Sequence, residues 1–158
     1  MGSRSSVGIQ YFAYGSNLCL SRLRSRVGEV ESRGPATLHR YFNINHAIEV
    51  RGADRVLYLS GQTANDAEGA PMHPGDLVAQ FRAAWGNLKA SLAAAGMDAT
   101  NIVRLNMYTT DVQGFMAAAG EFVPIFAEDG CKPVSTLLGV AGLFQPEIMI
   151  ELEATAVA

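Results

Sequence analysis

DLVAQFRAAWGNLKASLAAAGMD, residues 76–98, is the stretch that decides the fold of this chain. Asp76 can accept a hydrogen bond from a free amide at a helix N-terminus, and Gly96 can end the helix. The apolar residues between them recur at helical spacing on one face: Leu77, Phe81, Ala84, Trp85, Leu88 and Leu92. The stretch therefore predicts an amphipathic helix from Leu77 to about Ala95, with one face packed on a core.

Segments with strand-like or helical patterns surround this helix. Residues 46–50 alternate in polarity and are joined by RGAD to RVLYLSG, which together predict a β-hairpin. A second helix is predicted near Phe115 to Phe126, begun by Asp111 and kinked at Pro124. The remaining predicted strands are residues 101–112, 135–143 and 147–157. The order β-β-α-β-α-β-β predicts an α+β fold, a sheet with two helices on one face.

The last predicted strand gives its two faces different characters. Glu151 and Glu153 share one face, and Ile150 and Leu152 share the other. Several other strands are apolar on both faces, which indicates burial between copies of the chain. We therefore expect a homo-oligomer.

Charge and composition exclude several classes of function. The chain has 158 residues and a formal net charge of -3, which argues against nucleic acid as the chief partner. Its one basic cluster, Arg22, Arg24 and Arg26, is interpreted as the solvated face of a helix. No apolar run approaches the roughly 20 residues that span a membrane, so no membrane partner is expected.

The cysteines and histidines also lack the spacing of known site types. Cys19 and Cys131 lie too far apart in sequence for a metal motif, and reduced thiols in a cytoplasmic protein are the favoured interpretation. His39 and His73 have no carboxylate or cysteine partners at ligand spacing. No metal site is predicted.

From about residue 41 to residue 158 the chain resembles the Rid family of enamine and imine deaminases, also called YjgF-like proteins, and residues 44–158 are interpreted as the Rid-like domain. The resemblance rests on six pieces: HAIEV, LYLSGQTANDAEG, the helix quoted above, NIVRLNMYTTDV, KPVSTLLGV and IELEATAVA. It implies a chorismate-mutase-like α+β fold and a homotrimer with small-molecule pockets between subunits. It also implies cofactor-free hydrolysis of 2-imino or 2-enamino acids to 2-keto acids and ammonia.

Four residues match functional positions of that family. Glu151 stands where the family has its water-activating glutamate, and a carboxylate suits that role as a general base. Ser60, Gly61 and Gln62 stand at the pocket-lining end of a strand, where backbone groups can orient a substrate.

Four other positions of the pocket depart from the family. Ser135 replaces the arginine that binds the substrate carboxylate, Leu137 replaces a cysteine, Ile44 a tyrosine and Ala119 an asparagine. Loss of a buried bidentate arginine contact costs about 2–5 kcal/mol, so the resemblance implies weakened or altered activity. His46 lies on the same strand face as Ile44. It is either a substitute ligand or a hydrogen-bonded interface histidine.

Residues 1–43 resemble a different family. Residues 11–43 are similar to the opening of a γ-glutamylcyclotransferase and read YFAYGSNLCLSRLRSRVGEVESRGPATLHRYFN. In that family the YGSN loop, which matches residues 14–17, contacts the substrate. The later strands and the catalytic glutamate of that barrel have no counterpart here, and a barrel cannot close on one strand and one helix. The segment is therefore either a fragment in a chimera or a divergent strand-helix extension.

Three functional hypotheses remain open at this point. The first is a trimeric hydrolase with weakened or altered activity on imines or enamines. The second is a non-catalytic trimer that binds small metabolites in the same pockets, which the replacement of arginine by Ser135 favours. The third is a fusion without activity.

Overall fold

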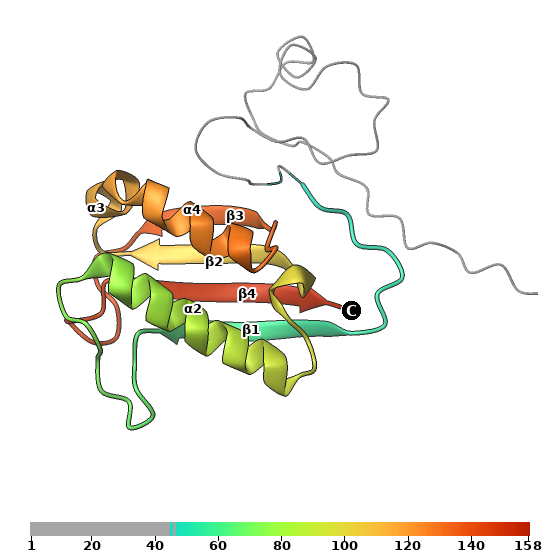
Figure 1. Cartoon of the computed structure of the whole chain (residues 1–158), viewed down its shortest axis with the longest axis horizontal. Coiled ribbons are helices and arrows are strands. Elements are labelled where there is room, and N and C mark those ends of the chain that lie inside the picture. Colours follow the sequence, from blue (N-terminus) through green and yellow to red (C-terminus); the bar gives the residue numbers. More distant parts are fainter. Residues whose placement is uncertain (1–44, 46) are drawn as a thin grey trace, which may run out of the picture.

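The computed structural model describes residue 45 and residues 47–158 (Figure 1). Its elements, in chain order, are β1 (Val56–Thr63), α2 (Leu77–Ala94), a 3-10 turn (Ala99–Asn101), β2 (Ile102–Thr109), α3 (Val112–Ala117), α4 (Ala119–Glu128), β3 (Val134–Gly139) and β4 (Ile150–Val157). The predicted strand-helix segment 1–43, Ile44 and His46 lie outside the described residues.

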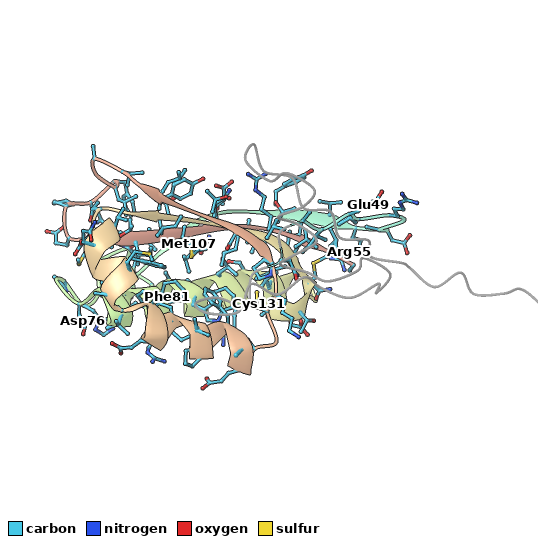
Figure 2. The ribbon with its side chains drawn as sticks, turned by 90° about the horizontal axis from the view of Figure 1, so that it is seen from above. Glu49, Arg55, Asp76, Phe81, Met107 and Cys131 are labelled. Carbon is cyan, nitrogen blue, oxygen red and sulfur yellow. The ribbon has the colours of Figure 1, made fainter. Side chains whose placement is uncertain are left out.

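In the described part of the chain, the strands form one mixed sheet in the order β1-β4-β2-β3. β4 pairs antiparallel with both β1 and β2, while β3 runs parallel to β2. Helices α2 and α4 lie on the same face of the sheet, as Figure 1 and the edge-on view of Figure 2 show. This arrangement confirms the predicted α+β class with helices packed on one face.

Helix α2 has the ends and the buried face that its sequence predicted. The Asp76 side chain accepts a 2.9 Å hydrogen bond from the backbone N–H of Ala79, and Gly96 follows the helix with φ of +70°. Every residue of the predicted apolar stripe is buried. Phe81 packs at 4.5 Å, centroid to centroid, on Phe122 of α4, so aromatic contacts join the two helices over the sheet.

The second helical region is broken, but away from its proline. Asp111 begins α3 as predicted and accepts a hydrogen bond of 2.8 Å from the N–H of Gly114. The break is at Ala118, which is both the C-cap of α3 and the N-cap of α4. Pro124 lies inside α4, six residues further on. The prediction of one helix kinked at Pro124 was therefore wrong in the position of the break.

The predicted hairpin is the main difference in the fold. Residues 47–50 form no strand of the sheet. Asn45 hydrogen-bonds to the carbonyls of Pro133 and Lys132 at the start of β3, whereas Arg55 pairs with Ala158 at the end of β4. Because β1 and β3 are opposite edges of the sheet, residues 47–54 pass around its end (Figure 1). They cannot pair with β1 along this path.

The faces of β4 confirm the predicted alternation. Ile150, Leu152, Ala154 and Ala156 are buried under the helices, and Glu151 and Glu153 lie on the other face. In the register of the sheet, Asn106 lies opposite Glu153 and Tyr108 opposite Glu151. The helix-free face of the sheet therefore carries the polar side chains of β2 and β4.

Candidate functional site

An open cleft of about 400 Å³ lies on the helix-free face of the sheet. Its lining comes from the end of β1, from β2, from β4 and from the segment that follows β3: Ser60, Gly61, Tyr108, Val140, Leu143, Glu151 and Glu153. Two carboxylates and a phenol thus face an apolar wall made by Val140 and Leu143. A small molecule with a polar and an apolar side fits such a lining.

A bulge in β1 brings the backbone of Gly61 against Glu151. The pairing of β1 with β4 shifts register between Leu59 and Gln62, so Ser60 and Gly61 leave the regular ladder. A Cβ atom on Gly61 would lie 1.6 Å from Glu151 Oε1 and 2.6 Å from its Cδ. Only glycine leaves room for the carboxylate in this position.

Glu153 is held by two hydrogen-bond donors from β2. The Tyr108 hydroxyl donates to Glu153 Oε2 at 2.6 Å, and the Asn106 Nδ2 donates to the same oxygen at 3.3 Å. These bonds, that of Tyr108 first, lower the pKa of Glu153 below its ordinary value. The same contact with Glu153, together with burial, raises the pKa of Tyr108. Glu153 is therefore a fixed negative charge and Tyr108 a neutral donor.

The two carboxylates of the cleft have different environments. Glu153 is held by Tyr108 and Asn106, whereas no group among the described residues donates a hydrogen bond to the side-chain carboxylate of Glu151. The lone pairs of Glu151 are therefore available to a water molecule or substrate in the cleft. Carboxylates in contrasting environments take different roles in many enzymes.

Three of the predicted site residues meet in this cleft, and four others lie elsewhere. Ser60, Gly61 and Glu151 line it together. Gln62 does not line it, because its side-chain amide turns back to the carbonyl of Ser60 at 3.1 Å. Ala119 is buried at the start of α4, on the helix side of the sheet.

Ser135 and Leu137 lie on the helix side as well. In the parallel pairing of β2 and β3, Ser135 lies beside Leu105 and Leu137 beside Met107. Leu105 and Met107 are buried in the core, and Leu137 packs against that core. Paired positions in a sheet point to the same side, so the structure does not bring Ser135 to Glu151. Ile44 and His46 are outside the described residues.

Tyr108 and Glu153 are site residues that the sequence reasoning did not select. Their signal was the alternation of their strands, which already placed Glu153 on the face of Glu151. In β2, Tyr108 alternates with the buried residues Met107 and Thr109, which indicates the face opposite the core. Residue spacing alone did not reveal that the two strands pair with Tyr108 opposite Glu151.

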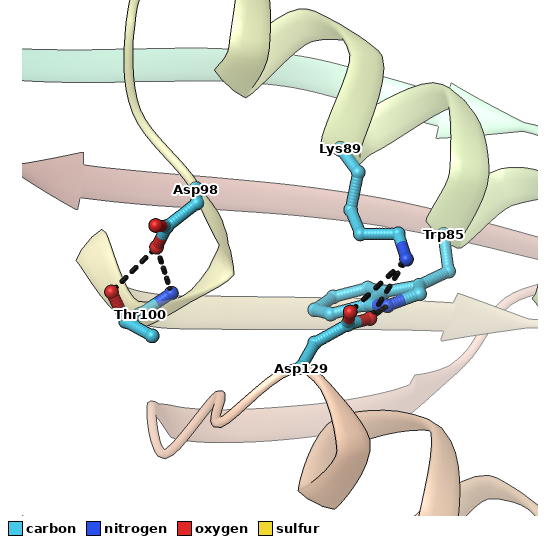
Figure 3. Close-up of polar contacts among 5 residues, drawn as sticks. All are labelled: Trp85, Lys89, Asp98, Thr100 and Asp129. Atoms are coloured by element: carbon cyan, nitrogen blue, oxygen red, sulfur yellow. Dashed lines mark hydrogen bonds and ion pairs between the residues drawn. The ribbon is translucent and has the colours of Figure 1, made fainter.

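A second polar cluster, away from the cleft, joins α2 to the end of α4 (Figure 3). Asp129 accepts hydrogen bonds from the Trp85 indole at 2.6 Å and from the Lys89 ammonium at 2.9 Å. Burial favours a higher pKa for Asp129, but these bonds outweigh it and the pKa is lowered. In the same view, Asp98 caps the 3-10 turn through Thr100. Both contacts hold helix ends in place.

The described residues show neither a metal-binding cluster nor a membrane-spanning helix. Within residue 45 and residues 47–158, no group of three or more histidine, cysteine, aspartate or glutamate side chains is arranged to hold a metal ion. None of the helices described has both the length and the apolar character needed to cross a membrane.

The sequence of this chain matches a known family over most of its length. Residues 32–158 match the sequence profile of the family described as Endoribonuclease L-PSP, to which proteins of the Rid type belong. This chain is a Rid-family protein. The match extends into the segment 1–43 and gives no support to a γ-glutamylcyclotransferase origin for it. That origin stays a prediction.

Curated relatives of this Rid-family protein include deaminases. The chain is 32% identical over 114 residues to Protein DfrA of Myxococcus xanthus, and this match covers 72% of this chain and 84% of that protein. It is 30% identical over 126 residues to the 2-iminobutanoate/2-iminopropanoate deaminase of Mus musculus, which covers 80% of this chain and 87% of the mouse protein.

Solved structures of the Rid family share the fold described above. The Rid protein YyfB of Yersinia pestis superposes with a TM-score of 0.70 at 33% identity, covering 79% of this chain and 96% of that chain. The YjgF gene product of E. coli superposes with a TM-score of 0.59 at 29% identity, covering 78% of this chain and 92% of that chain.

Proposed function

We propose that this Rid-family protein hydrolyses the C=N bond of small, reactive imines or enamines, releasing ammonia and a carbonyl compound without a cofactor. The observation that carries the proposal is the position of Glu151, whose carboxylate lies in the open cleft against the backbone of Gly61. The deaminase relatives support the reaction type. Residues 1–43 have no part in the proposal, whether they are a cyclotransferase fragment or a divergent extension.

In the proposed reaction Glu151 acts as the general base. Water attacks the carbon of a protonated C=N group while Glu151 takes one proton from the water. The C–O bond forms, and the electron pair of the C=N π bond moves to nitrogen. Glu151 then returns the proton to that nitrogen, and the C–N bond breaks with release of ammonia. The hydroxyl proton passes to this ammonia, which leaves the C=O group and an ammonium ion. Atoms and charge balance without an oxidant or reductant.

The activity on 2-imino acids, which carry a carboxylate, is proposed to be weak. In the Rid resemblance an arginine binds that carboxylate, and this chain has Ser135 at the matching position. Ser135 also lies on the helix side of the sheet beside Leu105, so its hydroxyl is not offered to the cleft. Loss of such an arginine contact in a buried site costs about 2–5 kcal/mol of binding.

We also propose that the protein works as a homotrimer in the cytoplasm. Exposed apolar side chains on the sheet support an interface between copies: Val56 is 52% exposed, Tyr58 79% and Leu138 49%. Cys131 is a free, buried thiol, which agrees with a reducing compartment. Analytical ultracentrifugation of the full chain tests the assembly, and a monomer at micromolar concentration would contradict it.

The family description names an endoribonuclease, but we do not propose that activity here. Glu151 and Glu153 both line the cleft, and like charges repel the phosphates of a nucleic acid.

The test of the reaction is ammonia release from imines generated in the assay. An amino-acid oxidase supplies 2-imino acids and an amine oxidase supplies imines without a carboxylate. The protein should accelerate ammonia release above the rate of spontaneous hydrolysis, and Glu151→Gln should remove most of this effect. Glu128→Gln, which removes the same charge from an exposed site at the end of α4, is the matched control.

Two results would count against this proposal. Native protein that gives no rate above background with either class of imine would leave only a metabolite-binding role. A Glu151→Gln variant as active as the native protein would show that another group activates the water.

A further inference from the structure

We infer that Glu153 is a specificity-determining residue, and that the cleft selects substrates that carry a protonated C=N group and no carboxylate. This inference rests on the proposed function, because it assigns the substrate class of the same site. It goes beyond weak activity on 2-imino acids by stating which charge the cleft prefers.

The geometry of β4 places two negative charges in one small space. Glu151 and Glu153 both line the cleft and are separated by one residue on the same face of the strand, so their Cα atoms lie about 7 Å apart. An iminium or ammonium group in the cleft is attracted by both carboxylates. A carboxylate in the same place is repelled by both.

Glu153 cannot easily lose its charge to accommodate an anion. Tyr108 and Asn106 donate hydrogen bonds to its Oε2, and both bonds lower its pKa. No donor among the described residues reaches its Oε1, which leaves that oxygen for a ligand. The hydrogen bonds thus fix both the charge and the orientation of the carboxylate.

The apolar wall completes the description of the ligand. Val140 and Leu143 lie in the same cleft as the two carboxylates, and they offer contact to a small hydrocarbon group. The described lining contains no lysine or arginine. Arg104 is on the same face of the sheet, and its charge also helps to lower the pKa of Glu153. It is exposed, however, and donates to Asn106 at 3.3 Å rather than lining the cleft. The chemistry that fits is a short alkyl or aryl imine in its protonated form.

The test compares two probes of nearly equal size and shape but opposite charge, isopropylammonium and isobutyrate. Binding to the full-length protein is followed by NMR chemical-shift titration, which also reports whether the amides of Gly61 and Tyr108 respond. Isopropylammonium should bind at least tenfold more tightly than isobutyrate. Glu153→Gln keeps an acceptor for the Tyr108 hydroxyl but removes the charge, and it should weaken isopropylammonium binding about tenfold.

The control variant Glu128→Gln should leave the affinities for both probes unchanged. Isobutyrate binding as tightly as isopropylammonium, or the absence of isopropylammonium binding at Gly61 and Tyr108, would overturn the inference. So would an unchanged affinity for isopropylammonium in Glu153→Gln.

Hydrolysis assays separate this inference from the proposed function. Ammonium selectivity without hydrolysis of any imine would refute the proposed function and leave the charge preference standing. Faster hydrolysis of a 2-imino acid than of the matching imine without a carboxylate would keep the proposed function and refute the inference.

Discussion

Replacing Gly61 with alanine should displace the Glu151 carboxylate without unfolding the protein. The new Cβ would lie 1.6 Å from Glu151 Oε1, whereas an ordinary contact begins at 3.4 Å, so the oxygen must retreat by about 1.8 Å. Gly61 has no positive φ, so the backbone itself accepts alanine. The atom that must move is the end of a flexible side chain, and holding such a side chain away from its preferred rotamer costs about 0.5–1.5 kcal/mol.

The consequence for catalysis should be much larger than the consequence for stability. A displacement of about 1 Å in a reacting group can cost on the order of 100-fold in rate. We therefore expect Gly61→Ala to reduce imine hydrolysis by about 10- to 100-fold. The free energy of unfolding should fall by no more than about 1.5 kcal/mol.

The assay measures ammonia release together with thermal unfolding, and a crystal structure of the variant reports the position of the carboxylate. Gly86→Ala is the matched control, because Gly86 lies inside α2 with nothing within 4 Å of its added Cβ. That change should keep full activity and raise stability by roughly 0.5–1 kcal/mol. Full activity in Gly61→Ala, or a carboxylate that has not moved, would refute the reasoning.

Three further predictions test other parts of the structure. Ser135→Arg should not improve hydrolysis of 2-imino acids, and it should lower the free energy of unfolding by several kcal/mol because its charge enters the helix side of the sheet. Chemical denaturation measures this loss, and Thr136→Arg, at an exposed position, is the control that should be tolerated. Faster hydrolysis of 2-imino acids by Ser135→Arg would show that residue 135 faces the cleft. Asp129→Asn should lower the free energy of unfolding by roughly 1–2 kcal/mol at neutral pH. Because the pKa of Asp129 is lowered in the fold, this difference from the native protein should shrink as the pH falls below about 4. A difference that does not change with pH would contradict the prediction. Burial, and then the charge of Asp129, raise the pKa of the Cys131 thiol to about 12, so iodoacetamide at neutral pH should label it only after denaturation, as peptide mass spectrometry can show.

The fold could be predicted from the sequence where one physical signal dominated. The apolar stripe of residues 77–92 and the caps at its ends predicted the bounds of α2 to within one residue. The strict alternation of β4 gave the faces of Glu151 and Leu152. The hairpin failed because alternation in residues 46–50 shows only that they can form a strand. It does not identify the neighbour, and Asn45 is held at the opposite edge of the sheet from β1.

The site was harder to predict, because it depends on which strands pair. Gly61 and Glu151 were selected through a family resemblance, and their close contact follows from a bulge that no spacing pattern revealed. Ser135 was matched to the arginine of the family because both stand two residues after a proline. This spacing does not show which face of β3 the residue occupies. Tyr108 entered the site only through its register with β4.

The two faces of the sheet make the proposed function separable from stability. Leu152 is fully buried under the helices, while its neighbours Glu151 and Glu153 face the cleft. Truncation of Leu152 should therefore cost about 2–5 kcal/mol, whereas the two glutamates contribute no part of the core. Their replacement by glutamine keeps the side-chain volume. Glu151→Gln removes only charge, whereas Glu153→Gln also weakens the hydrogen bonds from Tyr108 and Asn106 and should lower the free energy of unfolding slightly at neutral pH. A loss of activity in Glu151→Gln with unchanged unfolding consequently reports on the chemistry of the cleft alone.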